Sequence, residues 1–171
     1  STSYMASLGH KNIAYVGGPE KNRISMQKFS GYVKAMKDAG LEIKPELVFR
    51  GDLRLKTGYY AARKFTMLSD LPDALVAEND ILGIGSMKYF AQRKIRVPDD
   101  IAVIGFDNIM LSALYEPALS TVSLPIQQMG EESVKLLTTV IEKPNTKNKL
   151  IILKNELIIR NSTDKNALVE I

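Results

Sequence analysis

The amino-acid sequence predicts an α/β fold in which a parallel sheet is flanked by helices on both faces. Short apolar segments recur along the chain, and longer segments with helical spacing of apolar residues separate them. The short segments are apolar along their whole length, which is typical of parallel strands buried under helices on both sides. The composition agrees, because 45% of the 171 residues are hydrophobic and 25% are charged, as in an ordinary globular protein.

Four segments are expected to form the strands of this sheet. Each contains a short apolar run bounded by Gly, Asp or Asn, residues that favour turns. The segments are NIAYVGG (12–18), ELVFRGD (46–52), DALVAEND (73–80) and IAVIGFDN (101–108).

Three helices are expected between the strands, and the pattern changes after Pro117. The helices span about residues 29–40, 59–68 and 81–93, and Asp80 is the expected N-cap of the third. After Pro117 we expect a strand over 118–125, a helix over 126–141, an exposed turn over 143–149, one or two strands over 150–163, and a frayed tail over 164–171.

Polar side chains follow the predicted strands where the strands end. Asp52, the run Glu78–Asn79–Asp80 and the pair Asp107–Asn108 all occupy such positions, whereas Gly17–Gly18 indicates a tight turn. The carboxyl ends of parallel strands share one edge of the sheet, and ligands of open α/β sheets bind there. The sequence therefore predicts a polar binding site at this edge.

The composition excludes several classes of chemistry. The chain has no cysteine and a single histidine, His10, which excludes thiolate sites and disfavours a Ser-His-Asp triad. The paired acids Asp99–Asp100 fall in a predicted turn, so we expect no enzyme, metal or cofactor. The net charge of +4 is scattered, and no signal peptide or membrane span is visible, so we expect a cytoplasmic protein without a membrane partner.

Seven segments in this order resemble the LacI/GalR family of bacterial transcription regulators, from about Leu8 to Thr163. They are LGHKNIAYVGGP, SGYVKAM, RGD with GYYAARK, PDALVAENDILGIGSMKYF, VPDDIAVIGFDN, YEPALSTVSLP and LIIRNST. Members of that family carry a DNA-binding headpiece followed by a two-lobed effector-binding domain with the type I periplasmic-binding-protein fold.

The resemblance implies that this sequence holds only the second lobe and its connections. Residues 1–121 would form the C-terminal lobe, 122–146 a crossover segment that belongs to the other lobe, 147–163 the return strands, and 164–171 a tail. The headpiece and most of the first lobe lie outside these residues, so the protein would bind DNA only through the headpiece. Helix 126–141 would then expose its apolar face or cover it with another copy of the chain.

The function implied by the resemblance is the sensing of a small polar effector, a sugar or sugar derivative, by a homodimeric regulator. Two alternatives stay open. One is the catabolite-control branch, whose members respond to a seryl-phosphorylated carrier protein. The other is a periplasmic-type sugar-binding protein used in transport.

The resemblance also points to ligand-binding residues. Asp107, in the GFD segment, and Asn79 would contact the effector, although Asp107 could instead only shape a turn. Many members have an arginine where this sequence has Lys28, and an ammonium cannot offer the planar fork of a guanidinium. Arg23 lies five residues earlier and is a candidate substitute.

Four further residues are candidates for the homodimer interface. They are Ile84, Met87, Tyr89 and Tyr115. For Ile84 and Met87 an ordinary core position is an equal alternative, whereas a tyrosine beside an exposed turn supplies both area and a hydroxyl to an interface.

Overall fold

The computed structural model describes residues 1–143 and 149–169, and a four-stranded parallel sheet lies at its centre. The strand order is β2–β1–β3–β4, with Tyr15 of β1 in register with Val48 and Val76. All four predicted strands are confirmed, each shorter than its predicted segment. Their bounds are Ile13–Gly17 (β1), Val48–Arg50 (β2), Ala74–Ala77 (β3) and Ala102–Ile104 (β4).

The three helices predicted between the strands are present, and all begin earlier than predicted, α4 by only one residue. Asn22 caps α2, because its side-chain oxygen accepts hydrogen bonds from the backbone N–H groups of Ile24 and Ser25. The helices are α1 (Thr2–Ser7), α2 (Arg23–Asp38), α3 (Leu55–Phe65), α4 (Asp80–Gln92), α5 (Met110–Leu114) and α6 (Ile126–Glu142), with a 3-10 turn η1 at Pro45–Leu47. The sequence did not indicate the short helices α1 and α5.

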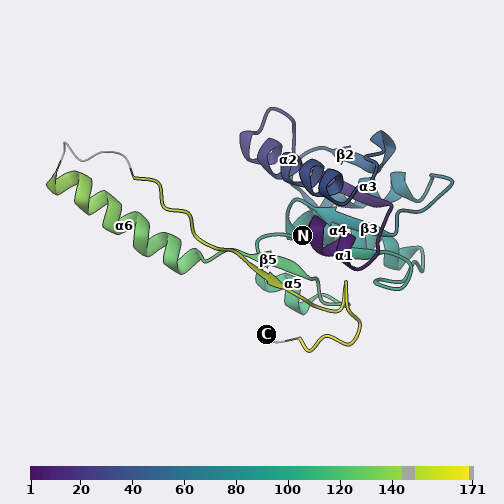
Figure 1. Ribbon diagram of the computed structural model, residues 1–171. Coiled ribbons are helices and arrows are strands. Elements are labelled where there is room, and N and C mark those ends of the chain that lie inside the picture. Colours follow the sequence, from purple (N-terminus) through teal and green to yellow (C-terminus); the bar gives the residue numbers. More distant parts are fainter. Residues whose placement is uncertain (144–148, 170–171) are drawn as a thin grey trace.

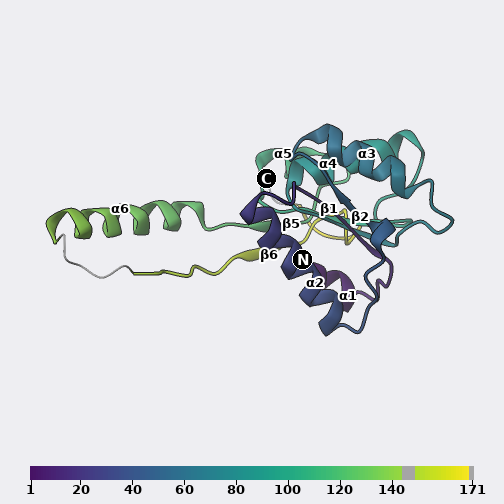
Figure 2. The ribbon, with the colours of Figure 1, turned by 90° about the horizontal axis from the view of Figure 1, so that it is seen from above.

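Helices cover both faces of the sheet, as predicted (Figures 1 and 2). On one face α1 and α2 bury Met5, Tyr32 and Met36 against the strands. On the other face α3 and α4 bury Phe65 and Phe90. Successive residues of a strand point to opposite faces, so each strand contributes to both cores, which explains why the strand sequences are apolar throughout.

Two antiparallel strands connect this body to a projecting helix. They are β5 (Thr121–Ser123) and β6 (Glu156–Ile158), and they carry α6 away from the sheet (Figures 1 and 2). No residue of α6 is buried within this chain, and whether another copy covers the apolar face stays a prediction. The predicted strands over 150–163 reduce to β6 alone.

The predicted turn lies mostly outside the described residues, and the start of the predicted tail is more ordered than expected. Most of the predicted turn over 143–149 falls on residues 144–148, which the structure does not describe. In the tail, the backbone N–H of Ala167 donates to the carbonyl of Asp164 at 3.0 Å, and the Asn161 amide donates to the carbonyl of Ala167 at 3.1 Å. The first residues of the predicted frayed tail are therefore held against the chain.

Candidate functional site

Lys28 connects the polar ends of two strands. Its ammonium donates a hydrogen bond to the backbone carbonyl of Glu78 at 2.9 Å, lies 3.8 Å from an Asp107 carboxylate oxygen, and sits 3.9 Å from the ring centre of Phe106. Glu78 follows β3 directly, and Phe106 and Asp107 follow β4. The structure therefore brings together Lys28 and Asp107, two of the predicted ligand-binding residues.

A buried carboxylate fixes the helix that carries Lys28. Glu78 is only 3% exposed, and its carboxylate accepts hydrogen bonds from the Tyr15 hydroxyl (3.1 Å), the Gly18 backbone N–H (2.6 Å) and the Ser25 hydroxyl (2.6 Å). Ser25 lies in the first turn of α2, so the carboxylate ties the start of this helix to the ends of β1 and β3. Burial and the negative charge of Glu78 both raise the pKa of Tyr15, so its phenol stays a neutral donor. Sequence reasoning placed Glu78 only at a strand end and missed this role.

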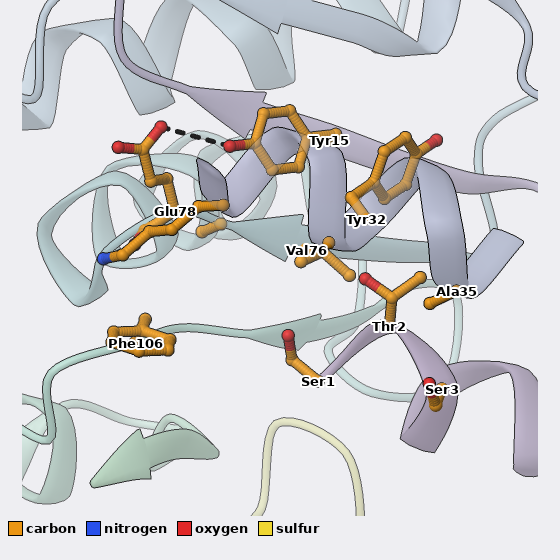
Figure 3. A pocket seen from close by; sticks show the side chains of 12 residues that line it. Ser1, Thr2, Ser3, Tyr15, Tyr32, Ala35, Val76, Glu78 and Phe106 are labelled. Atoms are coloured by element: carbon orange, nitrogen blue, oxygen red, sulfur yellow. Dashed lines mark hydrogen bonds between the residues drawn. The ribbon is translucent and has the colours of Figure 1, made fainter. Parts of the chain in front are cut away.

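A pocket of about 260 Å³ opens beside these residues (Figure 3). Aromatic rings of Tyr15, Tyr32 and Phe106 form part of its wall, and Lys28 and Glu78 contribute charged groups. Figure 3 shows the Tyr15 hydroxyl directed at the Glu78 carboxylate, and the Tyr32 hydroxyl turned the other way. Aromatic surface with a few fixed polar groups is the usual lining of a site for a small polar ligand.

Asp107 keeps part of its carboxylate accessible, with 37% of its side chain exposed. Partial burial raises the pKa of Asp107, the positive charge of Lys28 opposes this shift, and the negative charge of Glu78 adds to it. An ionised carboxylate here can accept hydrogen bonds from a ligand, as its predicted role requires.

The roles predicted for Asn79 and Asp80 need correction. Asn79, not Asp80, caps α4, because its side-chain oxygen accepts a hydrogen bond from the Leu82 N–H at 2.9 Å. Asp80 is fully buried and accepts hydrogen bonds from the Thr121 hydroxyl (2.6 Å) and the Ile109 N–H (2.9 Å). Ligand contact by Asn79 stays a prediction, and it now rests on the amide nitrogen because the oxygen is engaged.

Arg23 is not brought to this group of residues. It is the first residue of α2 and is exposed, and within residues 1–143 and 149–169 it has no ion pair. Five residues correspond to about 140° around a helix, so Arg23 and Lys28 leave α2 in different directions.

Three of the four residues predicted for the dimer interface lie in the core of this chain. Ile84, Met87 and Tyr89 are 2%, 1% and 5% exposed and pack in the cluster between the sheet and α3. The structure thus shows the core position that the sequence left open for Ile84 and Met87, and it gives the same position to Tyr89. Tyr115 is partly buried at the edge of that cluster. Contact of these residues with a second chain stays a prediction.

Comparisons with known proteins agree with this fold. Residues 2–163 match the family model of the periplasmic binding protein-like domain. The transcriptional repressor PurR of Histophilus somni is 32% identical over 162 residues, which cover 95% of this chain and 49% of the repressor. A regulatory protein of the LacI family from Chloroflexus aggregans is 32% identical with a TM-score of 0.89, over 94% of this chain and 58% of that protein.

A second similar structure contains a ligand. It is the complex of the transcriptional regulator CelR with cellobiose, which is 30% identical with a TM-score of 0.88, over 95% of this chain and 50% of that protein. This chain spans about half the length of the curated relatives it matches. Across the described part of the chain, every helix is too short or too polar to cross a membrane.

Proposed function

Because this chain belongs to the periplasmic binding protein-like family, within the LacI/GalR regulators, we propose that it is the effector-sensing half of a transcriptional repressor. Its ligand would be a small polar molecule, a sugar or sugar derivative, bound against the pocket that Lys28, Glu78 and Phe106 line. The observation that carries the proposal is the position of the Lys28–Asp107 pair, which lies beside that pocket at the carboxyl edge of a parallel sheet.

In the proposed mechanism the ligand closes the first, N-terminal lobe of the full-length protein over this edge. The segment 122–146 would be the crossover to that lobe. A ligand that binds one lobe arrangement more tightly than the other shifts their populations, and a DNA-binding headpiece would follow that shift. The proposed setting is a homodimer in the cytoplasm, where the DNA is.

The relatives named above are repressors or regulators, which favours this proposal over transport. The catabolite-control alternative predicts instead that the protein binds a seryl-phosphorylated carrier protein.

Calorimetry on the full-length protein tests the proposal, with D-glucose, D-ribose, cellobiose, adenosine and the phosphorylated carrier protein as partners. We expect one of the small molecules to bind, and Asp107→Asn to weaken its binding by about tenfold or more, since a charged hydrogen bond contributes roughly 1.5–3 kcal/mol. Asp38→Asn, which changes an exposed acid on the same helix as Lys28, is the matched control and should leave affinity unchanged.

Equal affinities of the wild type and Asp107→Asn would contradict the proposed site. Binding of the carrier protein alone would instead favour the catabolite-control alternative.

A further inference from the structure

The loop that carries Asp107 has an unusual backbone. Asp107 has φ +110° and Asn108 has φ +52°, values that residues other than glycine rarely adopt. Such a conformation is strained and persists only where neighbouring groups hold it. Two hydrogen bonds to β5 hold it here: the Asp107 N–H donates to the Val122 carbonyl (2.9 Å), and the Asn108 N–H donates to the Thr121 hydroxyl (3.3 Å).

The side chain of Asn108 connects this loop to β5 and to the segment that follows β6. Its amide nitrogen donates to the Ser123 hydroxyl at 3.2 Å, and its amide oxygen accepts from the Arg160 guanidinium at 2.8 Å. Ser123 is the last residue of β5, two residues before Pro125, and Arg160 lies two residues after β6. The Asn108 amide therefore joins the Asp107 loop to the segment that leads into α6 and to the segment that returns from it.

Arg160 is itself rigidly placed. It is 5% exposed, and its guanidinium also donates to the Leu119 carbonyl and the Ser112 hydroxyl, both at 3.0 Å. Burial lowers the pKa of Arg160 and the carboxylate of Asp80 opposes this, so the side chain stays charged at neutral pH. A buried guanidinium with three fixed acceptors leaves Asn108 little freedom to turn.

We propose that Asn108, held between Ser123 and Arg160, is a positioning residue that transmits ligand binding at Asp107 to β5 and β6, and through them to α6. The inference rests on the proposed function, in which Asp107 contacts the ligand and α6 belongs to the other lobe. Asp107 is hydrogen-bonded directly to Val122, and its neighbour Asn108 is hydrogen-bonded to Ser123, so a ligand that shifts the backbone of Asp107 would shift both residues of β5. Asn108 thus sets how strongly ligand binding changes the lobe arrangement.

Two substitutions separate this role from folding. Asn108→Gly removes the amide but tolerates the positive φ, so the loop backbone gains no steric strain. Ser123→Ala removes only the β5 side of the contact. Asn161→Ala is the matched control, since that amide donates only to backbone carbonyls of the tail.

The first measurement needs no ligand. In the 171-residue chain, hydrogen exchange of the Asp107 N–H should become at least about tenfold faster in Asn108→Gly and Ser123→Ala, and stay unchanged in Asn161→Ala. Equal protection in the wild type and both variants would show that the contact does not hold the loop, and would overturn the inference.

The second measurement uses the full-length protein, with cellobiose, D-ribose and adenosine as probes and the DNA site that the wild type selects from a random-sequence pool. We expect both variants to bind the active probe within about threefold of the wild type. The change in DNA affinity that this probe causes should fall at least about fivefold, the low end of typical coupling between sites.

The outcomes separate the two proposals. A wild type that responds to a probe, with variants that respond equally, overturns the role of Asn108 and leaves the proposed function standing. A wild type that binds neither these probes nor D-glucose overturns the proposed function, and this inference with it.

Discussion

Asp80 is a fully buried carboxylate at the base of the Asp107 loop, and its protonation is coupled to folding. Its two hydrogen bonds, from Thr121 and Ile109, join α4 to β5 and to the residue after Asn108. Burial raises the pKa of Asp80 to about 6, and these hydrogen bonds offset only part of that effect. The unfolded chain ionises this group near its ordinary pKa of 3.8.

Between these two pKa values the folded protein binds more protons than the unfolded chain, so the Asp80 contribution to stability is present below pH 3.8 and is lost as pH rises through 6. The difference between a pKa of 3.8 and a pKa of about 6 corresponds to roughly 3 kcal/mol of unfolding free energy. We expect Asp80→Asn to remove this dependence. Urea denaturation of both proteins between pH 4 and pH 7 checks this, and parallel stability curves for the two would contradict it.

The sequence could not assign the roles of Asn79 and Asp80. Both residue types are good N-caps, so local preference does not choose between them. The choice is made by Thr121, which lies far along the chain and draws the Asp80 carboxylate inward. For the same reason the role of Glu78 was missed, since its donors come from three separate positions on β1, the following turn and α2.

At the scale of elements, α3 and α4 cross in close backbone contact, which glycines permit. A methyl group on Gly58 would overlap the carbonyl oxygen of Leu82, and one on Gly85 would overlap that of Leu55. The obstacle in each case is backbone, which cannot turn aside as a flexible side chain can. These glycines therefore fix how closely α3 approaches α4.

We expect Gly58→Ala to lower the free energy of unfolding by about 1–3 kcal/mol, because the two helices must separate to admit the methyl group. Gly31→Ala is the control, since Gly31 is an exposed position of α2 with no atom near its added methyl group. That change should stabilise the protein by roughly 0.5–1 kcal/mol through helix propensity. Urea denaturation measures both, and equal effects of the two substitutions would disprove the close contact.

Element types were more predictable than element boundaries. The buried strands and the helices between them follow from apolar spacing, which burial on both faces imposes. The first turn of α2 was missed because its apolar residues Ile24 and Met26 are 62% and 39% exposed and do not continue the buried stripe. The helices α1 and α5 span six and five residues, too short to show a period.

At the scale of the whole molecule, the polar ends of the strands predicted where a site would lie, because parallel strands bring those ends to one edge. Lys28 and Asp107 meet there as expected. Arg23 does not join Lys28 and Asp107 because α2 begins at Arg23, so both Arg23 and Lys28 are helical residues. Their side chains then leave the helix on different sides. Errors in element boundaries thus become errors in side-chain direction.

The helix α6 leaves a large apolar surface on the described part of the chain. Val134, Leu137 and Ile141 lie at helical spacing on one side and are 65%, 61% and 69% exposed. Burying each such side chain contributes roughly 1.5–3 kcal/mol, so contact between two copies is favoured once their concentration is sufficient.

We expect the 171-residue chain to associate in sedimentation velocity at concentrations of tens of micromolar. Replacing all three residues by Gln should weaken association at least about tenfold while leaving the stability of the lobe unchanged, because no residue of α6 is part of its core. Met67→Gln, at an exposed apolar residue elsewhere, should not change it, and a wild type that stays monomeric at these concentrations would show that α6 does not bind a second copy.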